Sequence, residues 1–170
     1  MLSEENESTA SGFEREETPI ASAIMNGATM KLLKGFTSAQ LEGLYSLAYH
    51  DYQSGQYERA EKFFQLLTIL DHLNLKYVLG YGAALKKTGK LTQAIVVYSC
   101  AYFLDSNDVR IPFYCGLCHI EMNQLKEAES AFYLASSMNA STPEQKGYVQ
   151  RAGSCLVLVR KKQKEAKSTQ

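Results

Sequence analysis

One short motif contains the residue types that bind metals or haem. It is Cys115-Gly116-Leu117-Cys118-His119, which has the C-x-x-C-H spacing of a c-type haem attachment site and places two thiols beside an imidazole, as zinc sites do. A zinc site would need a second pair of ligands, and the other histidines, His50 and His72, lie outside such a spacing. Haem attachment would need export to an oxidising compartment, whereas residues 1–7 are acidic and unlike an export signal. We therefore expect neither a metal nor a cofactor.

No other arrangement of residues predicts a reaction. The acidic residues are scattered, and the sequence has no glycine-rich phosphate loop and no order of Ser, His and Asp typical of nucleophilic catalysis. The longest nearly apolar run, residues 94–104, is too short to span a bilayer. The cysteines are expected to be reduced thiols; they are Cys100, Cys115, Cys118 and Cys155. The sequence therefore predicts a cytosolic protein that is not an enzyme and does not insert directly into a membrane.

The charges balance overall but are divided between the two ends of the chain. The 18 Lys and Arg residues equal the 18 Asp and Glu residues, so we expect no basic surface for nucleic acid. Residues 1–20 hold six acids and one base, a net charge of −5, while residues 143–170 hold seven bases and two acids, a net charge of +5. The basic run 160–164 is interpreted as the solvated end of a helix. One hypothesis is that the opposed ends attract each other between protomers.

A period of 34 residues organises the middle of the chain. Similar residues recur at this spacing without a gap, which is the sign of a structural repeat. The recurring sets are Ala60, Ala94 and Ala128; Phe64, Tyr98 and Phe132; Leu70, Leu104 and Met138; Asp71, Asp105 and Asn139; Gly55, Gly89 and Asn123; and Ala48, Gly82 and Gly116. Apolar residues at helical spacing lie on both sides of each Gly or Asn, the residue types that end a helix in the left-handed conformation. Each unit is therefore predicted to be a pair of helices.

The period, the small residues and the aromatic residues together resemble the tetratricopeptide (TPR) repeat. We predict an all-α solenoid, because a single unit cannot bury its own apolar face and several must stack. The predicted segments are a disordered acidic tail at 1–17, a helical segment at 18–36, three TPR helix pairs at 41–74, 75–108 and 109–142, a capping helix at 143–164 and a disordered tail at 165–170. The repeats and the capping helix form one TPR domain, 41–164.

The first helix of each TPR pair lines the concave face of such a stack. The second, fifth, ninth and twelfth positions of the three units face this groove. They hold Glu42, Tyr45, Tyr49, Tyr52, Lys76, Leu79, Ala83, Lys86, Arg110, Phe113, Leu117 and Ile120. Because Leu44, Leu47 and Ala48 fill the core positions of the first unit, its tyrosines are expected to form an exposed strip that binds a partner. Tyr and Leu at helical spacing are also typical of a buried core, and that alternative stays open at this point.

Several stretches are similar to the translocator (class II) chaperones of bacterial type III secretion systems. They are Leu44-Tyr45-Ser46-Leu47-Ala48-Tyr49, Tyr52-Gln53-Ser54-Gly55-Gln56-Tyr57-Glu58, Phe64-Gln65, Leu70-Asp71-His72, Gly27-Ala28-Thr29, Gly80-Tyr81-Gly82-Ala83 and Arg110-Ile111-Pro112-Phe113. The resemblance covers about residues 20–160 and implies a non-enzymatic chaperone of the bacterial cytoplasm. Such a chaperone would bind hydrophobic translocator proteins and keep them soluble and secretion-competent before export. A short extended segment near the client's N-terminus would lie in the concave groove.

The resemblance also implies roles for particular residues. It adds Tyr57 and Tyr98 to the groove. The predicted peptide-binding residues are then Tyr45, Tyr49, Tyr52, Tyr57, Leu79, Ala83, Lys86, Tyr98, Arg110, Phe113, Leu117 and Ile120. A homodimer is implied through segment 18–36, with contacts from Ile20, Ile24, Met25, Met30 and Leu33. Two other functions remain open: a TPR adaptor or scaffold, and a regulatory subunit, each binding a partner that is not exported.

Overall fold

The computed structural model describes residues 29–168, and within them every regular element is a helix. The elements are α2 (Met30–Leu33), α3 (Ser38–Gln53), α4 (Tyr57–Leu70), α5 (Leu75–Lys87), α6 (Leu91–Leu104), α7 (Arg110–Glu121), α8 (Leu125–Ser137) and α9 (Pro143–Ser168). The predicted all-α class is therefore confirmed. The predictions for the acidic tail 1–17 and for Ile20, Ile24 and Met25 lie outside the described residues.

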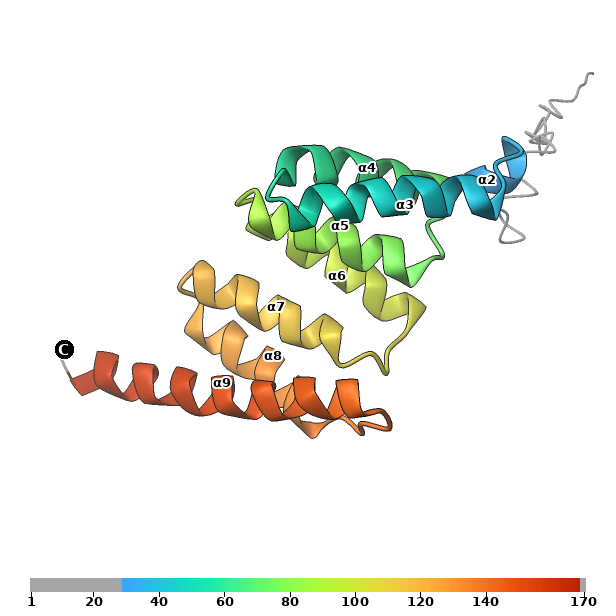
Figure 1. The fold of residues 1–170 in the computed structure, drawn as a ribbon. Coiled ribbons are helices and arrows are strands. Elements are labelled where there is room, and N and C mark those ends of the chain that lie inside the picture. The colour runs from blue at the N-terminus through green and yellow to red at the C-terminus, as the bar shows by residue number, and fades with distance from the viewer. Residues whose placement is uncertain (1–28, 169–170) are drawn as a thin grey trace, which may run out of the picture.

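The helices stack in the order in which they follow one another in the chain. Each helix from α3 to α9 contacts the next, so that α3 and α4, α5 and α6, and α7 and α8 form three helical hairpins. The short helix α2 contacts α4 at one end of the stack, and α9 packs against α8 and α7 at the other (Figure 1). No helix within residues 29–168 is both long and apolar enough to cross a membrane.

Local signals in the sequence set where the helices begin and end. α3 begins after a capping box, in which the Thr37 hydroxyl accepts a hydrogen bond from the Gln40 amide and the Gln40 side chain accepts one from the Thr37 amide. The hairpin turns need a left-handed backbone at Gly55, Gly89 and Asn123, whose φ angles are 82°, 78° and 58°. The prediction that these three residues end their helices in this conformation is confirmed.

Aromatic rings packed on glycines hold the hairpins together. A Cβ atom built on Gly82 would lie 2.5 Å from the Tyr98 ring, and one on Gly116 would lie 2.7 Å from the Phe132 ring. The two helices of repeats two and three therefore approach as closely as they do only because these positions lack a side chain. Both rings are fully buried, as are Ala94 and Ala128 of the same hairpins. The 34-residue period thus encodes the same packing unit in successive repeats.

Two expectations about single segments need correction. Leu47 was assigned to the core, but its side chain is 52% exposed. Its counterparts in the next repeats, Tyr81 and Cys115, are half-buried because a preceding hairpin covers them, whereas α3 belongs to the first hairpin. The capping helix α9 continues past the expected end at 164 as far as Ser168, so most of the tail assigned to 165–170 is helical.

Candidate peptide-binding groove

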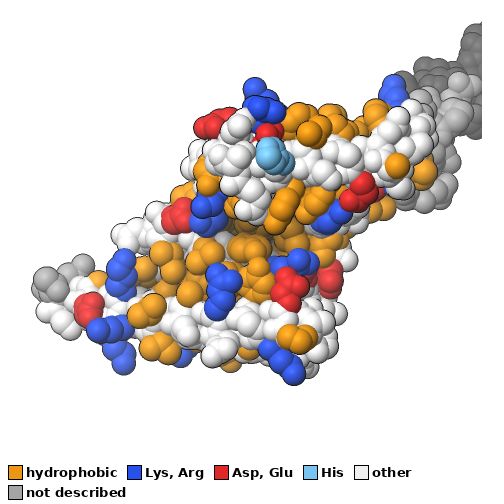
Figure 2. Space-filling view, viewed as in Figure 1, with side chains coloured by type: hydrophobic (Ala, Val, Ile, Leu, Met, Phe, Trp, Pro, Cys, Tyr) orange, Lys and Arg blue, Asp and Glu red, His pale blue; other side chains and the backbone are white. Residues whose placement is uncertain are grey.

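A groove of about 570 Å³ crosses the face made by α3, α5, α7 and the start of α9. Its lining residues are Tyr45, Tyr49, Tyr52, Phe64, Leu75, Lys76, Leu79, Gly80, Ala83, Arg110, Tyr114, Glu144 and Tyr148. Hydrophobic side chains gather in a hollowed band between α3 and α9 on the face that Figure 2 shows. The groove is open, and six of its thirteen lining residues are aromatic, which suits an extended segment of another chain better than a small polar molecule.

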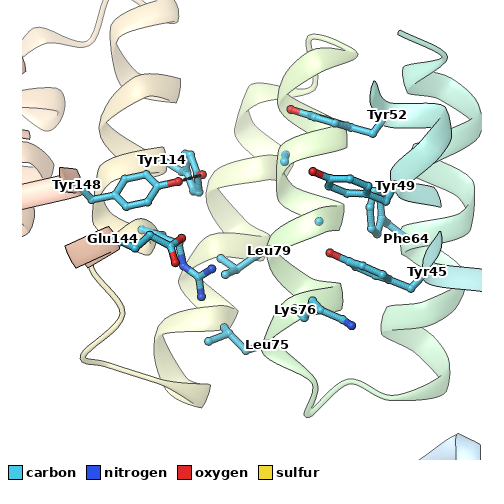
Figure 3. A pocket seen from close by; sticks show the side chains of 13 residues that line it. Tyr45, Tyr49, Tyr52, Phe64, Leu75, Lys76, Leu79, Tyr114, Glu144 and Tyr148 are labelled. Atoms are coloured by element: carbon cyan, nitrogen blue, oxygen red, sulfur yellow. Dashed lines mark hydrogen bonds between the residues drawn. The ribbon is translucent and has the colours of Figure 1, made fainter. Parts of the chain in front are cut away.

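The first wall is a row of three tyrosines on α3, called here the tyrosine row: Tyr45, Tyr49 and Tyr52. Their spacing of four and three residues places them on one side of the helix. Their hydroxyl groups point into the groove (Figure 3), and the Tyr45 and Tyr49 rings stack with centroids 6.1 Å apart. Tyr45 also packs against Phe64, at 5.9 Å between centroids, whereas Tyr49 is 50% exposed. The row therefore offers an open aromatic surface whose inner edge is fixed by the core.

The hydroxyl groups of Tyr45 and Tyr52 remain protonated at neutral pH. Burial raises the pKa of Tyr45, partly offset by the nearby Lys76 ammonium, and burial is also the main cause of the raised pKa of Tyr52. A neutral phenol can both donate a hydrogen bond to a backbone carbonyl and accept one from a backbone amide. This is the chemistry that an extended peptide without secondary structure of its own requires.

The floor of the groove comes from α5 and is apolar and flat. Leu79 is buried, while Leu75 and Ala83 are half-buried. A Cβ atom on Gly80 would lie 2.4 Å from the Phe64 ring, so the aromatic side chain of α4 reaches the floor only because this position is glycine. The floor therefore has shallow apolar surface with no charged group at its centre.

The second wall is made by α7 together with the capping helix α9. The hydroxyl oxygens of Tyr114 and Tyr148 lie 2.8 Å apart and share a hydrogen bond (Figure 3). Tyr114 also stacks on the buried Tyr98, with ring centroids 5.5 Å apart. Burial, and then the hydrogen bond to Tyr148, raise the pKa of Tyr114. This wall is therefore a pair of tyrosines joined by a hydrogen bond, whereas Tyr45 and Tyr49 of α3 contact each other by ring stacking.

Two of the three charged residues that line the groove, Lys76 and Arg110, are paired within the chain. Lys76 Nζ lies 2.9 Å from both Glu42 carboxylate oxygens and 4.0 Å from the centre of the Tyr45 ring. Arg110 donates hydrogen bonds to both oxygens of the buried Asp108, which raises the pKa of the guanidinium. With these charges largely compensated, selectivity in the groove would come from shape and apolar contact more than from a long-range field.

The structure brings half of the twelve predicted peptide-binding residues to the groove. These are Tyr45, Tyr49, Tyr52, Leu79, Ala83 and Arg110. Tyr57 lies behind the groove with its ring centroid 5.5 Å from that of Tyr52, and Lys86 forms an ion pair with Glu121. Leu117 packs on the core of the third hairpin, and Ile120 lines a different cleft.

Two of the predicted residues, Tyr98 and Phe113, are core residues. Phe113 is 1% exposed because α9 covers it: its ring centroid lies 5.3 Å from that of Tyr148, and the Arg151 guanidinium lies 4.8 Å from it. Tyr98 is buried beneath Tyr114. Both rings support the second wall from behind, and neither is accessible from the groove.

The sequence argument missed the contribution of the capping helix. Glu144 and Tyr148 line the groove, and each stands 34 residues after a groove residue, Arg110 and Tyr114. Carrying the period one unit further from Arg110 would have identified Glu144, since the start of α9 occupies the place of the first helix in a fourth repeat, whereas Tyr148 corresponds to Tyr114, which the prediction also omitted. The other lining residues outside the predicted list are Phe64, Leu75, Lys76, Gly80 and Tyr114.

The C-x-x-C-H motif is part of the packing of α7. Burial raises the pKa of the Cys115 thiol to about 12 and that of Cys118 to about 11, so both remain protonated and poor metal ligands. The Nδ1 atom of His119 lies 2.8 Å from the Gln124 side-chain oxygen, at the turn into α8. No cluster of three or more His, Cys, Asp or Glu side chains suited to a metal occurs in residues 29–168.

Stacked helical hairpins with an aromatic concave groove define a peptide-binding protein of the tetratricopeptide class. The family model of the tetratricopeptide repeat matches residues 41–74 and 75–108. Low calcium response locus protein H of Yersinia pseudotuberculosis serotype I is 39% identical over 141 residues, which cover 83% of this chain and 84% of the relative. By this relationship, the chain belongs to the translocator chaperones of type III secretion systems.

Solved structures of relatives share the whole fold. A type III secretion complex from Aeromonas hydrophila matches with a TM-score of 0.80 at 33% identity, over 85% of this chain and 97% of that one. The Yersinia enterocolitica chaperone SycD in complex with a peptide of the translocator YopD matches with a TM-score of 0.69 at 40% identity, over 75% of this chain and 97% of that one. SycD has also been solved as an alternative dimer.

Proposed function

We propose that this protein is a chaperone of the bacterial cytoplasm that binds hydrophobic translocator proteins in its groove before their export by a type III secretion system. The observation that carries the proposal is the tyrosine row facing the Tyr114–Tyr148 pair across an apolar floor. Membership of the translocator chaperone family supports it, as does the SycD relative, which binds a translocator peptide. The protein would have no enzymatic activity of its own.

The groove suits an extended client segment for physical reasons. Apolar client side chains would lose contact with water against the tyrosine row and Leu79, and the free backbone groups of the segment would bond to the tyrosine hydroxyls. The walls are already fixed by contacts with the core, so little side-chain entropy would be lost on binding. Release would need no nucleotide, because the export machinery can pull the segment away.

The protein would act as a homodimer through segment 18–36. Of the five residues assigned to this contact, the structure describes Met30, which is partly exposed on α2, and places Leu33 at the end of the same helix. The alternative dimer of SycD supports self-association in this family. Deleting residues 18–36 should convert the dimer to a monomer in light scattering. An unchanged mass after the deletion would exclude this segment as the contact.

Co-expression tests the function directly. Each translocator encoded with this chaperone would be expressed alone and together with it, and its soluble fraction and its co-purification would be measured. We expect at least one translocator to become soluble only with the chaperone and to elute bound to it. If no translocator depends on the chaperone while another, non-exported protein co-purifies in equal amount, the protein is an adaptor rather than a chaperone.

A further inference from the structure

A second cleft, of about 360 Å³, lies between the end of α7, the start of α8 and the C-terminal half of α9, and it shares no lining residue with the groove. It is called here the C-terminal cleft. Its lining residues are Ile120, Leu125, Leu158, Val159, Lys161, Lys162 and Glu165. Leu158 is 64% exposed although it belongs to the lining, so the cleft presents apolar surface directly to solvent. Such a surface beside charged groups is typical of a binding site for another polypeptide segment.

The rim of the C-terminal cleft is basic. Lys161 and Lys162 line the cleft and are exposed, and Glu165, which also lines it, lies 3.9 Å from Lys161. The preceding Arg160 is bound to Glu129 on α8, with 2.7 Å between Nε and Oε1. The long stems of the lysines extend the apolar surface while their ammonium groups stay in water. The cleft therefore fits a large apolar side chain followed by several carboxylates.

The same chain contains a segment of that composition outside the described residues. Residues 13–17 are Phe-Glu-Arg-Glu-Glu, an aromatic residue followed by three acids and one base. Residues 1–20 carry a net charge of −5 and residues 143–170 one of +5, so the two ends attract each other at low salt. We propose that residues 13–17 of one protomer bind in the C-terminal cleft of a second copy of the chain. Phe13 lies on Leu125 and Leu158, and the three glutamates face the lysines of α9.

The position of the N-terminal end favours a second copy over the same chain. Figure 1 shows α2 at one end of the stack and the C-terminal half of α9 at the other. The 16 steps from Phe13 to Thr29 span at most about 55 Å when fully extended, at about 3.4 Å per step. To reach its own cleft, the segment would have to run along the stack from one end to the other, with a large loss of chain entropy. A second copy can present its cleft without this constraint.

Zero-length cross-linking of the full-length protein tests the contact. Unlabelled and ¹⁵N-labelled chains would be mixed, and a carbodiimide would join carboxylates to lysine amines that are in contact. We expect cross-links between the glutamates at 14, 16 and 17 and Lys161 or Lys162, with about half of the cross-linked peptides carrying one labelled and one unlabelled partner. If both halves of every cross-linked peptide carry the same label, the contact lies within one chain and binding between protomers is overturned. If no cross-link joins these glutamates to Lys161 or Lys162, the contact itself is overturned.

Charge reversal supplies a second test in the full-length chain. Lys161→Glu with Lys162→Glu should weaken the self-association measured by sedimentation at least fivefold, and adding Glu14→Lys, Glu16→Lys and Glu17→Lys to the same chain should restore it. A matched control is Lys62→Glu with Lys146→Glu, which changes the net charge equally at exposed sites away from the cleft. If the control variant loses as much association as the Lys161→Glu, Lys162→Glu variant, the effect is one of net charge in general, and the proposal is overturned.

Sedimentation at two salt concentrations completes the test. Raising the salt from about 50 mM to about 500 mM should weaken the association of the wild-type chain at least fivefold and should leave the Lys161→Glu, Lys162→Glu variant unchanged, because screening acts on the charges that it lacks. Salt-independent association of the wild type would contradict the proposal. So would a cleft that cross-links to a client's acidic segment and never to residues 14–17. Translocator binding in the groove is a separate property and should be retained by both lysine variants.

Discussion

The two walls of the groove come from equivalent positions of the repeat but differ in how they are supported. On α3, the Tyr45 and Tyr49 rings stack on each other, and Tyr49 keeps half of its surface exposed. On α7, Phe113 occupies the position that corresponds to Tyr45, yet it is buried, and the wall is made by Tyr114 together with Tyr148 of α9. One wall is an open row, and the other is a closed pair backed by core residues.

The difference shows that residues at the same position of successive repeats can be exposed in one repeat and buried in another. No helix within the described residues covers the outer side of the tyrosine row, whereas α9 lies across the end of α7 and buries whatever stands at its fifth position. The groove is consequently more exposed at the first hairpin than at the last, where the Tyr114–Tyr148 pair is backed by buried rings.

The largest expected loss of stability comes from truncating Phe113, the buried ring behind the second wall. Phe113→Ala removes a buried ring that contacts Phe132 and Tyr148, so it should lower the free energy of unfolding by about 3–5 kcal/mol. Tyr49→Ala, at a half-exposed position, should change it by less than about 1 kcal/mol. Urea unfolding followed by circular dichroism measures both. Similar changes in the free energy of unfolding for the two variants would mean that the two walls are equally well packed against the core.

The next largest loss of stability is expected from adding one methyl group to α7, the helix that carries Tyr114. In Gly116→Ala the new Cβ would lie 2.7 Å from the Phe132 ring, and repacking should cost about 1–3 kcal/mol. Gly153→Ala is the matched control, because nothing lies within 4 Å of its Cβ position in the middle of α9, and it should stabilise the helix by about 0.5–1 kcal/mol. Thermal unfolding should therefore show a lower melting temperature for Gly116→Ala and a higher one for Gly153→Ala. A lower melting temperature for both variants would contradict this prediction.

Removing one hydroxyl from the closed wall should have the smallest effect on stability. Tyr148→Phe breaks the hydrogen bond to Tyr114 and should cost about 0.5–1.5 kcal/mol, while leaving the ring packing on Phe113 in place. The control is Tyr133→Phe, whose side chain is exposed on α8 and should show no change. If both variants unfold at the same denaturant concentration, the tyrosine pair does not hold the wall.

Much of the fold was predictable because its signals are local. Gly55, Gly89 and Asn123 mark the turns by their own backbone preference, and the 34-residue period follows from counting. The exposure of Leu47 and the burial of Phe113 could not be predicted from the repeat alone, since each depends on whether a neighbouring helix covers it. The direction of the tyrosine row was predictable for the opposite reason: the first hairpin packs on only one side, so a regular helical spacing is enough.

The central claim is that the tyrosine row binds an extended translocator segment, and two variants of α3 test it most directly. Tyr49 and Leu47 lie on the same helix with nearly equal exposure, 50% and 52%, but only Tyr49 lines the groove. The dissociation constant of the translocator identified by co-expression would be measured for Tyr49→Ala, Leu47→Ala and the wild type. We predict at least a tenfold weakening for Tyr49→Ala and no change for Leu47→Ala, with both variants as stable as the wild type within about 1 kcal/mol. Equal affinities for all three proteins, or equal losses for the two variants, would contradict the claim.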